Sequence, residues 1–324
     1  MLAPASTPRP RTLAELAPPE LLARLDRLDV LSRKVFAGKL PGERRSRKRG
    51  TSVEFDDYRT YVAGDDLRRV DWNVFARLDR FFIKLFREEE DLALHVVVDA
   101  SASMDAGDPS KLVFAQRLAM ALAYIGLVNQ DRVVASIIGA PGRPPVQQLA
   151  PVRGRRNVER LTRFLLDAAW PPEGYGLRGG APAGPFAAAM RQLALSRRGK
   201  GVMVLISDFL VREDLRLALN YLAAGGSFEV YCLQVLSPGE MDPQSEAGGA
   251  VIGDLRFTDA ESGAPSEVTV SGALLKRYRE RLTDFTDGLR RACAARGMTH
   301  VLLRSDADLE KLLLDYLRRR GLLG

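Results

Sequence analysis

Cysteine and histidine are scarce in this sequence, with two residues of each among 324. Cys232 and Cys293 lie far apart in apolar surroundings, which predicts two buried free thiols and neither a disulfide framework nor a zinc site. There is no run of about 18 apolar residues, so no membrane span is expected, and the N-terminus has no hydrophobic signal core. Together these absences predict a soluble, cytoplasmic protein.

The common phosphate-binding loops are also missing. The sequence contains no G-x-x-x-x-G-K-[ST], and no G-x-G-x-x-G directly follows a predicted strand, so any ATP hydrolysis would have to come from a partner. Positive charge is in excess, at +7, and part of it lies in the runs 44–49 (R-R-S-R-K-R) and 318–320. These runs predict either phosphate or lipid contacts or a solvated basic face. Because neither run contains an aromatic residue for base stacking, we do not expect nucleic acid as a partner.

The most informative stretch is 92–104, which reads L-A-L-H-V-V-V-D-A-S-A-S-M. Its apolar, β-branched first half predicts a strand buried on both faces, as in a parallel sheet. Asp99, Ser101 and Ser103 then alternate, so in extended chain their side chains point the same way. Oxygen ligands of this kind favour Mg²⁺ or Mn²⁺ over zinc.

A second apolar strand, predicted over 201–206, ends at Asp208. If both strands are parallel neighbours, Asp99 and Asp208 meet at one rim of the sheet, where open α/β sheets place their sites. Two carboxylates brought together there would raise each other's pKa, and a cation between them would relieve the repulsion. The residues themselves indicate Asp99, Ser101 and Ser103 as oxygen ligands of one metal site.

The D-x-S-x-S pattern after such a strand resembles the metal-ion-dependent adhesion site of the von Willebrand factor type A domain. That resemblance implies that the strands ending at Asp99 and Asp208 are neighbours, so that Asp208 joins Asp99, Ser101 and Ser103 as a ligand of a Mg²⁺ or Mn²⁺ ion. It also implies that one coordination position of this ion is open for a carboxylate of a partner. It also implies a loop threonine as a further ligand, usually after Gly-Gly. Here Gly179 and Gly180 are followed by Ala181, and Thr162 lies inside a predicted helix, so that ligand is missing.

The segment 54–77 carries the pattern E-F-x-x-Y-R-x-Y-x-x-G-D-D-x-R-x-x-D-W-x-x-x-A-R. This pattern resembles the signature of the bacterial family called domain of unknown function 58, in which it precedes a von Willebrand type A-like domain. The resemblance implies a non-enzymatic adaptor that works beside a MoxR-type AAA+ ATPase in the chaperone-like assembly or maturation of client proteins. Within the segment, Trp72 is interpreted either as a core ring of a structural clamp or as part of a docking surface.

Strands alternating with helices predict an α/β fold, a doubly wound and mostly parallel sheet with helices on both faces. We expect a disordered tail over 1–15, a family-specific segment over 16–90 that packs on the main domain, and a von Willebrand type A-like domain over 91–324. A strand over 81–86 is expected to form a hairpin with the strand at 92–99. A second hairpin is expected as an insertion over 251–270, before a long helix over 274–295.

The alternative function is a Mg²⁺-dependent phosphohydrolase with Asp99 as nucleophile. Such chemistry usually needs a second carboxylate two residues further on, and Ser101 occupies that position. His95, inside a predicted strand, and His300 are not placed to substitute for it. The sequence therefore favours binding over catalysis.

Overall fold

The fold is taken from a computed structural model, which describes residues 7–31, 54–62, 70–87, 92–171, 185–246, 253–258 and 265–324. The basic run 44–49, the acidic turn 88–91 and the loop around Ala181 lie outside the described residues. The chain divides into two compact units. The larger comprises Met1–Ala37 and Leu92–Gly324, and the smaller comprises Gly38–Asp91.

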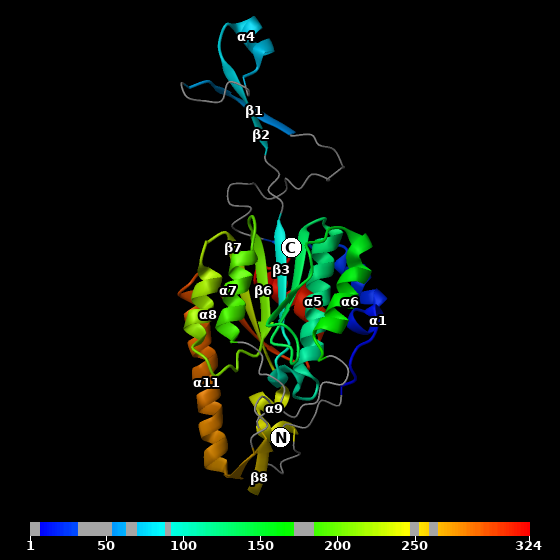
Figure 1. Cartoon of the computed structure of the whole chain (residues 1–324), viewed down its shortest axis with the longest axis vertical. Helices are drawn as coiled ribbons and strands as arrows, with labels where there is room; N and C mark the ends of the chain where they lie inside the picture. Colours follow the sequence, from blue (N-terminus) through cyan, green and yellow to red (C-terminus); the bar gives the residue numbers. More distant parts are fainter. Residues whose placement is uncertain are drawn as a thin grey trace. The chain divides into compact units, whose positions relative to one another are not determined.

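The larger unit is built on a six-stranded sheet, whose central strands β3, β6 and β7 are labelled in Figure 1. The strand order is β10-β7-β6-β3-β4-β5. All neighbouring pairs are parallel except β4–β5. The strands are β3 (Ala93–Asp99), β4 (Arg132–Ile138), β5 (Val146–Gln148), β6 (Gly201–Ser207), β7 (Phe228–Leu236) and β10 (Thr299–Arg304). The predicted α/β fold with a mostly parallel sheet is confirmed.

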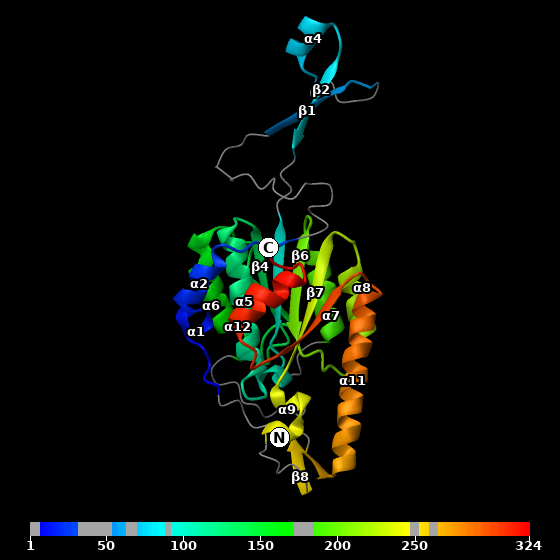
Figure 2. The ribbon, with the colours of Figure 1, turned by 180° about the vertical axis from the view of Figure 1, so that it is seen from behind.

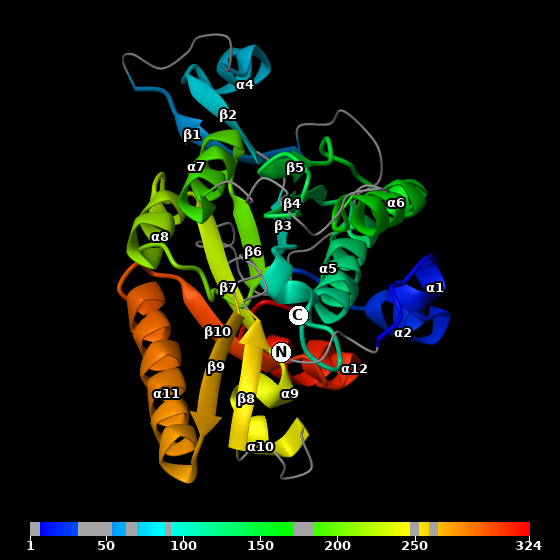
Figure 3. The same ribbon diagram turned by 60° about the horizontal axis from the view of Figure 1, so that its bottom comes forward.

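Helices cover both faces of this sheet (Figures 2 and 3). One face carries α1 (Leu13–Leu16), α2 (Pro19–Leu25), α5 (Lys111–Val128), α6 (Val158–Ala168) and α12 (Leu309–Lys311). The other carries α7 (Phe186–Ser196), α8 (Leu215–Ala223) and the end of α11 (Gly272–Ala294). The side chains of β3 alternate accordingly, with Val96 in the first core and Val97 in the second.

Helix α5 is apolar almost all round and lies in the first core. By length and composition this helix of 18 residues is apolar enough to cross a membrane, but 89% of it is buried inside the larger unit. Burial on this scale is what the central helix of an α/β domain requires, because it contacts the sheet and the helices beside it. Its N-cap is Ser110, whose hydroxyl accepts a hydrogen bond from the Val113 amide.

Residues 7–15 are the described part of the tail that was expected to be disordered over 1–15. Here Thr7 accepts a 3.1 Å hydrogen bond from the Ser110 amide, and Thr12 caps α1 by accepting a hydrogen bond from the Glu15 amide. These hydrogen bonds give residues 7–15 local structure that their Pro- and Ala-rich composition did not indicate.

Beyond the carboxyl end of β7 lie α9 (Pro238–Met241), α10 (Pro243–Glu246) and an antiparallel hairpin of β8 (Gly253–Thr258) and β9 (Pro265–Val270). The hairpin was expected at this place in the chain. The Tyr278 hydroxyl of α11 donates a 2.6 Å hydrogen bond to the Glu240 carbonyl, which joins α11 to α9. Figure 3 shows these elements gathered at one end of the sheet.

The smaller unit contains β1 (Glu54–Thr60), α4 (Trp72–Leu78) and β2 (Phe82–Arg87). Strand β2 pairs with β1 in antiparallel fashion, so the hairpin expected between residues 81–86 and 92–99 is wrong. Trp72 is 59% exposed and lies edge-on to Phe75 and Phe81, whose rings stack with centroids 4.3 Å apart. Trp72 is therefore not the core ring that one interpretation assumed.

Candidate functional site

The candidate site lies at the rim where β3 and β6 end. The two strands are parallel neighbours with Val98 opposite Ile206, so Asp99 and Asp208 leave the sheet at the same rim. Both carboxylates are buried. The next strand in the sheet, β7, ends at this rim as well and leads directly into α9.

Asp99 is held by donors from two chain segments. Its Oδ1 accepts a 2.9 Å hydrogen bond from the Ser101 amide, and its Oδ2 accepts a 2.6 Å hydrogen bond from the Ser207 hydroxyl. Burial, followed by the charge of Asp208, raises the pKa of Asp99 to about 6, although the serine hydrogen bonds oppose this rise. The predicted mutual effect of the two carboxylates is therefore present at Asp99.

Asp208 is engaged by a lysine. Its Oδ2 accepts a 2.8 Å hydrogen bond from Nζ of Lys111, and its Oδ1 accepts from the Leu210 amide at 3.0 Å. Nζ of Lys111 also lies 2.5 Å from Oε1 of Glu240. Burial by itself would lower the pKa of Lys111, but the charges of Asp208 and Glu240 outweigh it, so the pKa lies above its ordinary value.

Ser101 and Ser103 occupy the outer part of the rim. Both are half-buried, and their Oγ atoms are 3.1 Å apart. Ser101 is the N-cap of the 3₁₀ turn Ala102–Asp105, and Ser103 lies within that turn, shortly after the end of β3. Ser101 and Ser103 are thus the partly exposed members of the predicted ligand set, whereas Asp99 and Asp208 are buried.

These contacts bear on the Mg²⁺ ion that the sequence predicts. All four carboxylate oxygens of Asp99 and Asp208 already accept a hydrogen bond from the protein. Among the residues that the structure describes, no three carboxylate, imidazole or thiol side chains are grouped to hold a metal ion. Because the ammonium of Lys111 already contacts Asp208, these side chains do not fit a divalent ion that both aspartates bind directly. The metal ion stays a prediction.

Lys111 and Glu240 were missed by the sequence reasoning. A lysine at the start of an otherwise apolar helix was the available signal, because such a helix has little solvent-facing surface for it. For Glu240, the signal was the S-x-x-E pattern that begins at Ser237, which forms a capping box in the structure. Neither signal reveals that the two side chains meet each other and Asp208.

Neither histidine is placed to act as a general acid or base beside Asp99. His95 lies within β3 and is buried against Phe228, with ring centroids 5.0 Å apart, whereas Nε2 of His300 pairs with Oε1 of Gln234 at 3.1 Å. Asp99 itself is only 1% exposed. A buried carboxylate that already accepts two hydrogen bonds is poorly placed to attack a phosphate ester.

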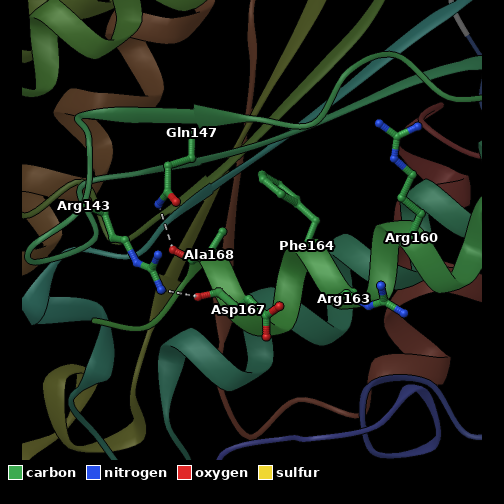
Figure 4. Close-up of a pocket in the computed structure, with 7 residues that line it drawn as sticks. All are labelled: Arg143, Gln147, Arg160, Arg163, Phe164, Asp167 and Ala168. Carbon is green, nitrogen blue, oxygen red and sulfur yellow. Dashed lines mark hydrogen bonds between the residues drawn. The ribbon is translucent and has the colours of Figure 1, made fainter. Parts of the chain in front are cut away.

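Apart from this rim, the structure has a surface pocket of about 340 Å³ beside α6, which Figure 4 shows. Its lining includes Arg143, whose guanidinium donates to the carbonyls of Asp167 and Trp170, and Gln147, which donates to the Ala168 carbonyl. These side chains satisfy carbonyls at and beyond the C-terminus of α6. Arg143 and Gln147 in this pocket therefore have a structural role, because they cap the C-terminus of α6.

Comparison with known proteins gives matches across the chain. Residues 57–286 match the family described as "Protein of unknown function DUF58". The chain is 29% identical over 327 residues to the uncharacterized proteins Mb1516 of Mycobacterium bovis and Rv1480 of Mycobacterium tuberculosis, covering 99% of this chain and 97% of each relative. Both relatives thus extend over nearly the whole chain.

Two solved structures show a more distant similarity. BatB, a conserved hypothetical protein from Bacteroides thetaiotaomicron, is 14% identical, with a TM-score of 0.43, over 70% of this chain and 98% of its own. The SpRpn10 VWA domain is 12% identical, with a TM-score of 0.39, over 69% of this chain and 94% of its own.

Proposed function

Because the chain belongs to the DUF58 family and its larger unit has a von Willebrand type A-like fold, we propose that it is a non-enzymatic protein-interaction module. More specifically, it acts as an adaptor that works beside a MoxR-type AAA+ ATPase in the assembly or maturation of client proteins. The sequence lacks the phosphate-binding loops of an ATPase, so a partner supplies the ATP hydrolysis.

The observation that supports this proposal is the difference in burial between the aspartates and the serines at the rim. Asp99 and Asp208 are buried and hydrogen-bonded, while Ser101 and Ser103, just beyond the end of β3, are partly exposed. Open α/β sheets bind their ligands at this edge. Hydroxyls held on a rigid turn can donate to a carboxylate or accept from an amide of a partner protein.

The test uses the full chain and each MoxR-type ATPase encoded in the same genome, purified separately and mixed with ATP or ADP. We expect one ATPase to bind in a nucleotide-dependent way, measured by biolayer interferometry. Replacing both Ser101 and Ser103 by alanine should weaken that binding about tenfold, the effect of losing about 1.4 kcal/mol of interaction. Ser196→Ala, an exposed position at the end of α7, is the matched control and should leave binding unchanged.

Two results would contradict the proposal. The first is the absence of binding to every such ATPase, or equal binding by the serine variant and the wild-type chain. The second is Mg²⁺-dependent hydrolysis of a phosphate ester that disappears in Asp99→Asn, which would favour the phosphohydrolase instead.

A further inference from the structure

We infer that Lys111 is the resident cation of this rim, held between Asp208 and Glu240, and that it replaces a divalent metal ion there. Its side chain is 0% exposed, and Nζ lies 2.8 Å from Asp208 and 2.5 Å from Glu240. Both contacts are ion pairs between residues distant in the sequence. The lysine thus joins the start of α5 to the ends of β6 and β7.

The backbone around Lys111 is fixed on both sides. Ser110, directly before it, caps α5 through the Val113 amide, and the Ser305 hydroxyl after β10 donates a 2.7 Å hydrogen bond to the Pro109 carbonyl. Lys111 is the first residue of the helix. A side chain that starts from such a fixed backbone loses less conformational freedom when its ammonium is placed between two carboxylates.

Glu240 is positioned to face this ammonium. Its Oε2 accepts a 2.8 Å hydrogen bond from the Ser237 amide in the capping box, which leaves Oε1 directed at Lys111. The Tyr278 hydroxyl holds the Glu240 carbonyl from the side of α11. Each oxygen of this carboxylate therefore has a specific partner within the chain.

Charge balance explains why the lysine and a divalent ion exclude each other. A buried ammonium needs nearby negative charge, and Asp208 and Glu240 provide it. A divalent ion bound to Asp208 would lie next to this ammonium, where like charges repel strongly because water is excluded. The lysine supplies Asp208, the carboxylate common to both arrangements, with the positive charge that a metal ion would otherwise supply.

This inference goes beyond the proposed function and does not depend on it. It concerns the ion pairs of Lys111 with Asp208 and Glu240, which are present whichever partner binds at the rim. Failure to bind an ATPase would leave it standing, because its test measures metal binding and thermal stability rather than binding of a partner.

The experiment titrates the full chain with MnCl₂, following free Mn²⁺ by electron paramagnetic resonance, and compares melting temperatures in EDTA, MgCl₂ and MnCl₂. For the wild-type chain we expect no stoichiometric Mn²⁺ binding and no shift of the melting temperature. In Lys111→Ala two buried carboxylates lose their cation, so the melting temperature should fall, and Mn²⁺ should bind at one equivalent and restore part of the loss. Lys311→Ala, which removes an exposed lysine, is the control and should change neither measurement.

The inference is overturned if the wild-type chain binds one equivalent of Mn²⁺ that Asp208→Asn abolishes. It is also overturned if Lys111→Ala is as stable as the wild-type chain. Should Lys111→Ala fail to fold, the Mn²⁺ titration of the wild-type chain against Asp208→Asn still decides the question. A variant with Lys111→Ala, Asp208→Asn and Glu240→Gln together, which lacks both ion pairs of Lys111 but keeps Asp99, should show no response to Mn²⁺.

Discussion

The hydroxyl of Ser207 donates a 2.6 Å hydrogen bond to Oδ2 of Asp99, and this bond joins the ends of β6 and β3 inside the larger unit. The same hydroxyl accepts a 2.9 Å hydrogen bond from the Phe209 amide. Phe209 has a φ of 58°, which a bulky residue adopts only when its surroundings hold it there. One serine thus connects the buried aspartate to the strained turn that carries Asp208.

Replacing Ser207 by alanine should therefore destabilise the chain. The change removes one of the two hydrogen bonds described for the Asp99 carboxylate and leaves the Phe209 amide without its acceptor. Loss of a partner for a buried polar group costs about 1–3 kcal/mol. Urea denaturation would measure the loss, with Ser196→Ala as an exposed serine control; equal effects of the two changes would contradict the assigned importance of the buried bond.

Gly139 should not tolerate a side chain. It follows β4 with a φ of 69°, and a Cβ there would lie 3.1 Å from Oδ1 of Asp99. We expect Gly139→Ala to lower the free energy of unfolding by about 1–2 kcal/mol, from the left-handed backbone and from displacement of the carboxylate.

Gly225 offers a control for the backbone part of this effect. Its φ is 84°, but a Cβ there would meet no atom within 4 Å. Gly225→Ala should therefore show the backbone cost alone, and the difference between the two variants measures the contact with Asp99. Equal losses in the two variants would mean that the carboxylate moves aside without cost.

His95 should make stability dependent on pH. Burial, and then the charges of Arg132 and Arg197, lower its pKa to about 4, whereas an unfolded histidine titrates near 6.5. Between these values the unfolded chain binds more protons than the folded chain. The stabilising contribution is thus fully present above about pH 6.5 and is lost as the pH falls towards 4, with about 2 kcal/mol lost from pH 7 to pH 5.

The measurement compares unfolding of the wild-type chain and His95→Leu across this pH range. His300, whose pKa is also lowered to about 4 by burial and then by the charge of Arg290, adds a loss of the same sign in both proteins. The raised pKa of Asp99 contributes with the opposite sign in both proteins, because between about pH 4 and pH 6 its folded form binds more protons than its unfolded form. The variant should therefore show a weaker rise of stability with pH than the wild-type chain, and the difference between the two proteins reports the contribution of His95. Identical dependence in the two proteins would show that His95 does not contribute.

In the smaller unit, an exposed and a buried residue should respond differently to truncation. Trp72 is 59% exposed, so Trp72→Ala should cost about 1 kcal/mol or less, whereas Ile83 is 3% exposed and Ile83→Ala should cost ~2–5 kcal/mol. Hydrogen exchange of the amides in β1 and β2, followed by mass spectrometry, reports the local opening of this hairpin. Faster exchange in Trp72→Ala than in Ile83→Ala would contradict the burial of these side chains.

The sheet could be predicted from local patterns. Apolar, β-branched runs such as 201–206 identify buried strands, and alternation with helices implies parallel neighbours. Because parallel strands end at the same edge, a shared rim for Asp99 and Asp208 could be expected from their places at the ends of two strands, and the type A resemblance added that these strands are neighbours. These features depend on residues close in the sequence and on the general topology of α/β folds.

The ion pairs at the rim could not be predicted in the same way. Lys111, Asp208 and Glu240 come from three separate segments, and their meeting depends on how the loops after three strands fold back. The partner of β2 was missed for a related reason. The sequence of β1, E-F-D-D-Y-R-T, lacks apolar alternation, so β3 looked like the nearer strand for pairing.

The antiparallel strand β5 closes one side of the sheet with only three residues, Val146–Gln148. The longer β4 is therefore covered along part of its length by a strand too short to offer an extended ladder to another molecule. Short edge strands limit edge-to-edge aggregation between copies of a protein. Lengthening β5 with alternating apolar residues should make the chain more prone to self-association at high concentration.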